Sequence, residues 1–296
     1  MATTNQFGKW ALSAGVSCAL LASVVADSAD ASTIGYWRFG DNPNEPGSLV
    51  ADSGPNELDL ALAGGAPLPT QVTLPATGPG SAFPQAVPLT QDSNTQAASF
   101  DGGGYFSLSD TSDFEITNQM TIEAYVNRSS MVGTRFLAAH NTTSGNNRSW
   151  FFGVTNAGQL RFGSSADGVG STNQNSTFAS EDTLEAGKDY YVAAVYNAGT
   201  VTFWVQNLTD DGELASSVVT GYEASLYDAD STFLIGNWNN GSATSWEGLI
   251  DEVRLSNTAL NENQLLAVPE PASLALLGAG GLLVLTRRKR RGQTTA

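Results

Sequence analysis

Alternation of apolar and polar residues with a period of two is the dominant pattern of this chain. From Gln119 to Asn127, an apolar side chain occupies every second position. The runs 190–196 and 201–206 flank the short Gly-containing segment 197–200. A period of two is that of a half-buried strand, and two such runs around a short turn are typical of a hairpin. Further strands are predicted at Ile34–Phe39, Ala97–Phe100, Gly104–Leu108, Arg135–Ala139, Trp150–Thr155, Leu160–Gly163, Thr232–Gly236 and Gly248–Leu255.

These strands indicate an all-β fold. No long amphipathic helix separates them, so we expect an antiparallel two-sheet sandwich over residues 32–267. Residues 61–96 hold six of the eleven prolines and little periodicity, and we expect them to form a surface insertion. After the last strand, Asn261 is expected to cap a short helical segment at 262–266, with Gln264 completing a capping box.

The composition indicates a packed globular domain and leaves few residues for disulfide bonds or histidine-based sites. Hydrophobic residues make up 41% of the 296 residues, which is enough for a packed core. The single cysteine, Cys18, lies in the N-terminal apolar stretch, so a mature exported domain contains no disulfide bond. With one histidine, His140, a zinc site built on His or a Ser-His-Asp triad is hard to assemble.

The N-terminal segment 1–31 has the order of a secretory signal peptide. Lys9 precedes an apolar run, and small residues end it at Ala29-Asp30-Ala31. Cleavage is expected after Ala31, with Ala26 as the second option. A buried N-terminal helix is the competing interpretation. Export is favoured because the charged, apolar and small-residue regions occur in the expected order.

The C-terminal segment 268–292 combines three blocks, which are Pro269-Glu270-Pro271, an uncharged run at 272–286 and the cationic cluster Arg287–Arg291. Fifteen residues of helix span about 22 Å, less than the hydrocarbon core of about 30 Å. We therefore expect a weak, one-pass transmembrane helix with its cations on the cytoplasmic side.

This order of blocks resembles the PEP-CTERM sorting signal. The resemblance implies recognition of Pro269, Glu270 and Pro271 by an exosortase, a membrane protease-transpeptidase of Gram-negative bacteria that make exopolysaccharide. An ordinary membrane anchor is the alternative. The expected location is the inner membrane for a time, through the C-terminal helix, and then the cell surface or the extracellular space.

The charge of the middle segment excludes one class of partner. Residues 32–268 hold seven Lys and Arg against 26 Asp and Glu, a formal charge of −19. Such a surface repels phosphate backbones, so nucleic acid is not expected as a partner. The same charge also repels anionic polysaccharide unless divalent cations bridge the two.

Six short stretches resemble the LamG-like family, and they occur in the order of that family. The resemblance implies a concanavalin A-like jelly roll over residues 32–267. The stretches are Tyr36–Asp41, Asp52–Gly54, Ser99–Gly102, Met120–Val126, Ala193–Tyr196 and Gly248–Leu255, the last followed by Ala259-Leu260.

Asp251 is the most informative acid of the chain. It shares strand parity with Leu249 and Val253, so a regular strand would turn it toward the core. A buried carboxylate without a partner is costly, so Asp251 must be hydrogen-bonded, bound to metal or displaced by a bulge. The family resemblance implies a structural Ca²⁺ held by Asp251, Asp41 and the carbonyl of Gly102. A strand-end Asp bonded to backbone is the alternative.

Catalysis finds little support in the sequence. Glycosidases on this sandwich place two acids on one strand face at the separation that displacement requires. The nearest candidate, residues 181–185, lies in a Ser/Asn-rich region and lacks this spacing. We therefore expect that the protein is not an enzyme.

Sugar binding is a more specific hypothesis than catalysis for this sequence. Trp238, Asn239 and Trp246 lie near strand ends, and an indole face flanked by amides suits a bound sugar. The competing interpretation places these tryptophans in the core. Two function classes remain: a surface or matrix module that binds polysaccharide or another surface protein, and a structural component of the envelope or biofilm without a specific ligand.

Overall fold

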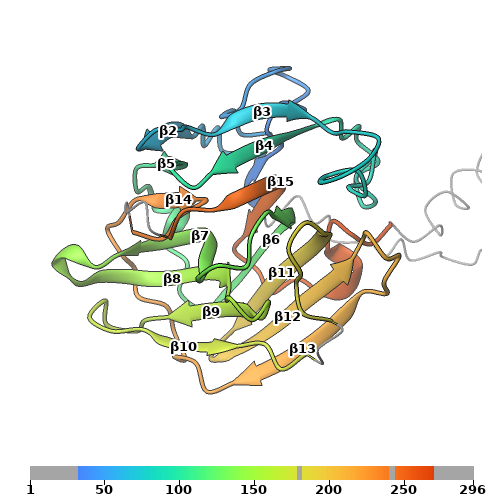
Figure 1. Cartoon of the computed structure of the whole chain (residues 1–296). Coiled ribbons are helices and arrows are strands. Elements are labelled where there is room, and N and C mark those ends of the chain that lie inside the picture. The colour runs from blue at the N-terminus through green and yellow to red at the C-terminus, as the bar shows by residue number, and fades with distance from the viewer. Residues whose placement is uncertain (1–32, 179–181, 240–243, 270–296) are drawn as a thin grey trace, which may run out of the picture.

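The computed structural model describes residues 33–178, 182–239 and 244–269, which form two antiparallel sheets packed face to face (Figure 1). The eight-stranded sheet has the order β13-β12-β11-β6-β15-β4-β3, with β1 also paired to β15. The seven-stranded sheet has the order β10-β9-β8-β7-β14-β5-β2. The strands are β1 Thr33–Trp37, β2 Ala61–Gly64, β3 Thr70–Thr73, β4 Gln96–Asp101, β5 Gly104–Leu108, β6 Gln119–Arg128, β7 Arg135–Thr142, β8 Asn147–Val154, β9 Leu160–Ser164, β10 Thr172–Asn175, β11 Asp189–Asn197, β12 Thr200–Asn207, β13 Ala215–Thr220, β14 Phe233–Ile235 and β15 Glu247–Ser256.

The predicted two-sheet sandwich is confirmed, and each strand predicted from alternation is present. The hairpin between β11 and β12 turns at Ala198 and Gly199, whose φ angles are +41° and +89°. Positive φ at both central residues gives a turn whose twist matches that of the flanking strands, and Gly adopts it without steric cost. The signal peptide predicted at 1–31 and the helix predicted at 272–286 lie outside the described residues. None of the helices in the described ranges is long and apolar enough to cross a membrane.

The main core fills the space between the sheets. Trp37 of β1 and Trp150 of β8 are buried there, and both pack on Phe233 of β14, with ring centroids at 5.2 and 6.1 Å. Phe152 of β8 stacks on Phe203 of β12 at 6.5 Å, which joins the two sheets directly. The apolar half of each alternating strand therefore points inward, as the sequence predicts.

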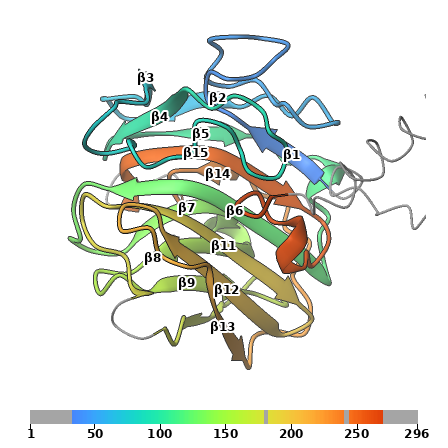
Figure 2. The same ribbon diagram turned by 90° about the vertical axis from the view of Figure 1, so that its right-hand side faces the viewer.

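A second apolar cluster lies on the outer face of the eight-stranded sheet. The insertion at 61–96 adds β2 to one sheet and β3 to the other, and its remaining residues, including Phe83 and Leu89, cover this face (Figure 2). The C-terminal segment packs beside them, where Leu265 and Leu266 are fully buried. Leu89 N donates to Leu266 O at 3.1 Å, so the insertion and the C-terminal segment are joined.

The predicted helical segment after β15 is a single 3-10 turn, Glu262–Gln264. The Asn261 side chain accepts from Asn263 N, and the Gln264 side chain accepts from Asn261 N at 3.1 Å. The capping box is therefore confirmed. Pro269 is exposed at the end of this segment, whereas Glu270 and Pro271 lie outside the described residues.

A β-bulge interrupts β15 between Asp251 and Arg254, where Glu252 has φ +51°. The strand pairs with β4 before the bulge and with β1 after it. Ile250 and Val253 both reach the main core, and Asp251 and Glu252 are turned to the outer face between them. Asp251 shares the outer face with Leu249 by regular alternation, and the bulge after it brings Val253 and Leu255 to the core, so the expected core-facing parity of Asp251 is wrong. Of the three outcomes expected for Asp251, the hydrogen bond is observed, from Glu252 N at 2.9 Å.

Candidate functional site

The outer face of the eight-stranded sheet carries two buried ion pairs. In the first, Glu123 Oε1 accepts from Arg254 Nε at 2.8 Å and from Arg254 Nη2 at 2.6 Å. Glu123 Oε2 accepts from the Tyr191 hydroxyl at 2.5 Å and from Leu266 N at 2.8 Å. Both charges are buried and all four contacts are charge-assisted, so this pair is a structural element that ties the C-terminal segment to the sheet.

In the second pair, Arg38 Nε lies 3.1 Å from both oxygens of Glu252, and Arg38 Nη2 lies 3.0 Å from Oε1. The Tyr36 hydroxyl also donates to Glu252. Burial raises the pKa of the Glu252 carboxyl, and the Arg38 guanidinium opposes that shift. Arg38 Nη2 further donates to Ser93 O at 2.6 Å, which fixes the insertion over the pair. Because protein covers these groups, the network has no face for a ligand.

Asp251 lies beside this network without a cation of its own. Its Oδ1 accepts from Glu252 N at 2.9 Å, whereas Oδ2 has no hydrogen-bond partner among the described residues. Burial and the neighbouring Glu252 raise the pKa of Asp251 well above its usual value. The Asn94 amide lies close enough to lower this pKa, yet neither of its polar atoms has a partner in normal hydrogen-bond geometry within the described ranges.

Of the three residues predicted to hold Ca²⁺, Gly102 is not brought to Asp251, whereas Asp41 lies close enough to contribute to the raised pKa of Asp251. Gly102 N donates to Trp246 O at 3.0 Å, and Trp246 lies five residues from Asp251, about 16 Å at the rise of a strand. Asp41 already accepts from the Thr95 amide and hydroxyl and from the next amide, at 2.6–2.7 Å. Calcium requires six to eight oxygen ligands, so the predicted set is incomplete without Gly102, and a calcium site at Asp251 stays a prediction. Residues 33–178, 182–239 and 244–269 contain no cluster of three or more His, Cys, Asp and Glu side chains that could hold a metal.

The environment of Trp246 also differs from the sugar-binding surface that the sequence predicted for it. It is 0% exposed in the main core, and its indole Nε1 lies 3.2 Å from the carbonyl oxygens of both Asn127 and Leu249. The Arg128 guanidinium covers its ring at 5.9 Å. A side chain enclosed in this way has no face for a sugar, so the prediction of Trp246 as a binding residue is wrong.

Trp238 has the opposite environment, on the outer face of the seven-stranded sheet. Its half-buried indole stacks on Phe136 at 5.3 Å with an interplanar angle of 23°, and meets Phe151 edge-on at 5.9 Å. We call these three residues the Trp238 patch. A Cβ at Gly163 would lie 2.2 Å from the Phe151 ring, so glycine there allows the ring to lie on β9.

Two features prepare Trp238 for binding. Asn141 Nδ2 donates to Trp238 O at 3.4 Å, and the stacking on Phe136 fixes the indole plane. The Trp238 Nε1 atom is itself buried and has no hydrogen-bond acceptor among the described residues, so a ligand would meet only the exposed part of the ring. A rigid aromatic face of this kind can stack on a sugar ring. Asn239, the third predicted residue, follows it in a half-buried position.

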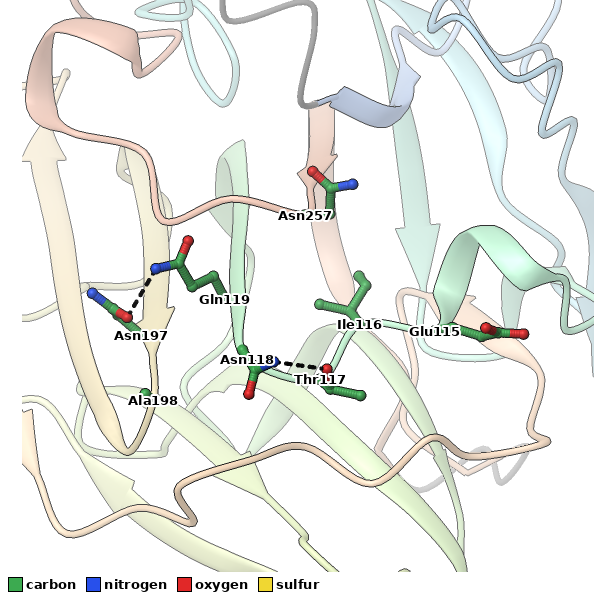
Figure 3. A pocket seen from close by; sticks show the side chains of 8 residues that line it. All are labelled: Glu115, Ile116, Thr117, Asn118, Gln119, Asn197, Ala198 and Asn257. Carbon is green, nitrogen blue, oxygen red and sulfur yellow. Dashed lines mark hydrogen bonds between the residues drawn. The ribbon is translucent and has the colours of Figure 1, made fainter.

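A hollow of about 470 Å³, separate from the Trp238 patch, lies at one end of the sandwich (Figure 3). Its lining includes the polar side chains of Glu115, Asn118, Gln119, Asn197 and Asn257. Gln119 Nε2 donates to Asn197 Oδ1 at 3.2 Å, so part of its hydrogen-bonding capacity is used internally. The hollow contains no aromatic side chain and therefore lacks the stacking surface that the Trp238 patch offers.

Comparison with known proteins gives two family matches. The model of the concanavalin A-like lectin/glucanases superfamily matches residues 100–266. The model of the PEP-CTERM protein-sorting motif matches residues 267–291, which include Pro269, Glu270 and Pro271. No curated protein matches the chain.

Solved structures share the fold at low sequence identity. Domain 4 of AbnA, a GH43 extracellular arabinanase from Geobacillus stearothermophilus, solved in complex with arabinotriose, is 15% identical, with a TM-score of 0.50 over 80% of this chain and 97% of that domain. The binding domain of Paraclostridial Mosquitocidal Protein 1 is 10% identical, with a TM-score of 0.53 over 81% of this chain. The botulinum neurotoxin serotype G binding domain is 9% identical, with a TM-score of 0.50 over 79% of this chain. The chain spans about half the length of these two toxin chains, at 52% and 50%.

Proposed function

Because the chain belongs to the concanavalin A-like lectin/glucanases superfamily and ends in a PEP-CTERM protein-sorting motif, we propose that it is an exported surface or matrix module that binds glycan through the Trp238 patch. The observation that carries the proposal is the half-buried indole of Trp238, whose plane is fixed by stacking on Phe136 on the outer face of the sheet. The arabinotriose complex of AbnA domain 4 supports it by analogy of fold alone.

The same proposal assigns no catalytic step to this surface. The strands of the seven-stranded sheet contain neither Asp nor Glu, and a glycosidase of this architecture needs a pair of carboxyl groups across the scissile bond. The arrangement therefore supports binding without turnover. A purely structural role, or binding of another surface protein, remains the alternative that the titration below distinguishes.

Titration of the full-length, detergent-solubilised protein with host exopolysaccharide should show weak binding, about millimolar to tens of micromolar. Trp238→Ala should weaken it about fivefold, because a stacked indole contributes roughly 1 kcal/mol. The matched control is Trp204→Ala, since Trp204 is a half-buried tryptophan on the outer face of the other sheet. Calorimetry measures both. Silence across a broad glycan panel would favour the structural role, and released sugar would overturn the non-catalytic proposal.

Processing should occur at both ends of the chain. We expect intact-mass analysis of the mature protein to show an N-terminus near Ser32, or at Asp27, and loss of the tail after about residue 268. The control is a host without its exosortase, in which the tail should be retained. A mature species that still carries Arg287–Arg291 in a host with an active exosortase would contradict sorting by this enzyme.

A further inference from the structure

The charges of this acidic protein are distributed unevenly between its two sheets. Residues 32–268 hold 26 acids, yet none lies in a strand of the seven-stranded sheet. Three of the seven cations of the same segment lie in consecutive strands of that sheet, Arg135 in β7, Arg148 in β8 and Arg161 in β9. The strands on which the Trp238 patch lies are therefore the least acidic part of the domain.

Two of these arginines are already engaged. Arg135 Nη2 lies 2.5 Å from Glu247 Oε1. Arg148 Nη1 donates to the carbonyl of Val169 and lies 3.5 Å from that of Gly168. Their guanidinium groups hold the ends of the strands, and they are not available to a ligand on the face of the sheet.

Arg161 is different. Its neighbours Leu160 and Phe162 point into the main core, so its own side chain lies on the outer face, where it is half-exposed. Its guanidinium donates to Asn173 Oδ1 of β10, and it forms no ion pair within the described part of the chain. Arg161 Nε is buried, so the terminal nitrogens of the guanidinium are the ones that a ligand could meet.

The register places this cation beside the aromatic patch. Arg161 is opposite Gly153 of β8, and Gly153 is opposite Phe136 of β7, on which Trp238 stacks. Two strand spacings separate Arg161 from Phe136, about 10 Å. Gly153 has no side chain, and the Phe136 ring lies over it: a Cβ at Gly153 would be 3.0 Å from Phe136 Cδ1, so the aromatic patch extends toward Arg161.

Building on the proposed function, we propose that this face binds an acidic glycan, in which Arg161 pairs with the carboxylate of a uronic acid while Trp238 stacks on a neighbouring ring. A guanidinium matches a carboxylate with two parallel N–H···O bonds. The acids in the strands of the eight-stranded sheet oppose an anionic chain weakly, because fields at physiological ionic strength decay over about 8 Å and stacked sheets are about 10 Å apart. The repulsion expected from net charge is therefore weakest over the strands of this face.

The test compares polygalacturonate with its carboxyl-reduced, neutral form, titrated into the full-length, detergent-solubilised protein in the presence of a chelator. The wild type should bind the acidic polymer about tenfold more tightly, since a hydrogen bond to a charged group contributes that much. Arg161→Gln should abolish this preference and Arg161→Lys should keep part of it. Lys188→Gln is the control for net charge, because Lys188 pairs with Glu185 and Asp210 outside the seven-stranded sheet.

The outcomes separate this inference from the proposed function. Equal binding of the two polymers that depends on Trp238 but not on Arg161 would overturn the acidic specificity and leave glycan binding in place. Binding of the acidic polymer only after calcium is added would assign the contact to a bridging ion and overturn the role of Arg161. Absence of binding to either polymer would overturn the acidic specificity, whereas glycan binding itself would be overturned only by silence across the broad glycan panel.

Discussion

Replacement of Arg254 by methionine should lower the free energy of unfolding by about 3–5 kcal/mol, the cost of leaving a buried charge without its partner. Glu123 and Arg254 are 0% and 2% exposed, and two nitrogens of Arg254 contact Glu123 Oε1 at 2.6–2.8 Å. Arg254 Nη2 also donates to Gln264 O at 2.5 Å, so the C-terminal segment should loosen at the same time. Urea denaturation of the full-length variant measures the loss.

The double variant Glu123→Gln/Arg254→Met should recover most of that stability. The amide keeps an acceptor for the Tyr191 hydroxyl and Leu266 N, and no unpaired charge remains. The surface control is Lys188→Met, which breaks exposed ion pairs and should cost no more than about 1 kcal/mol. A loss below 1 kcal/mol for Arg254→Met would mean that water reaches Glu123 and that the pair is not a structural element.

This network connects the folding of the domain to the sorting tail. Leu266, whose amide is bonded to Glu123, immediately precedes the sorting motif at residues 267–291. Residues 267–269, the first of that motif, therefore follow directly from the packed face of the domain. We expect a processing enzyme to meet a folded domain at the cleavage site.

The sequence predicted the central strands because apolar side chains that face the main core alternate along them with side chains that face outward. It did not predict β2, β3, β10 and β13, and the reason is physical. These strands lie at the edges of the sheets, where one partner suffices, and three of them have four residues, too few to show a period. In β10 the sequence Thr-Asn-Gln-Asn contains no apolar residue at all.

The site could be predicted in part. Trp238 and Trp246 look alike in sequence because both lie near a strand end. Their environments differ because the register of β15 places Trp246 over the carbonyl of Asn127, a contact 119 positions away in the chain. The sequence indicated that the Asp251 carboxylate is buried, but it could not identify the groups around it. Those groups include the ion pair of Arg38 and Glu252, which are 214 positions apart.

Asp251→Asn should stabilise the protein at alkaline pH by about 1–3 kcal/mol, the cost of a buried polar group without a partner. Burial and Glu252 raise the pKa of Asp251 well above its usual value, so the folded state keeps a proton that the unfolded chain releases near pH 3.9. The contribution of Asp251 to stability is therefore complete below about pH 4 and is lost as the pH rises toward the raised pKa. Asparagine resembles the protonated carboxyl and removes this loss.

Urea denaturation of wild type and variant from pH 4 to pH 9 should show two curves that meet near pH 4 and diverge as the pH rises. Some slope should remain in the variant, because burial also raises the pKa of Glu252. Asp101→Asn, at an exposed position of β4, is the matched control and should follow the wild type at every pH. Added Ca²⁺ distinguishes the remaining alternative. If Asp251 held the ion in some other ligand set, calcium would raise the melting temperature of the wild type alone, and Asp251→Asn would destabilise the protein at pH 8, contrary to the sign expected here.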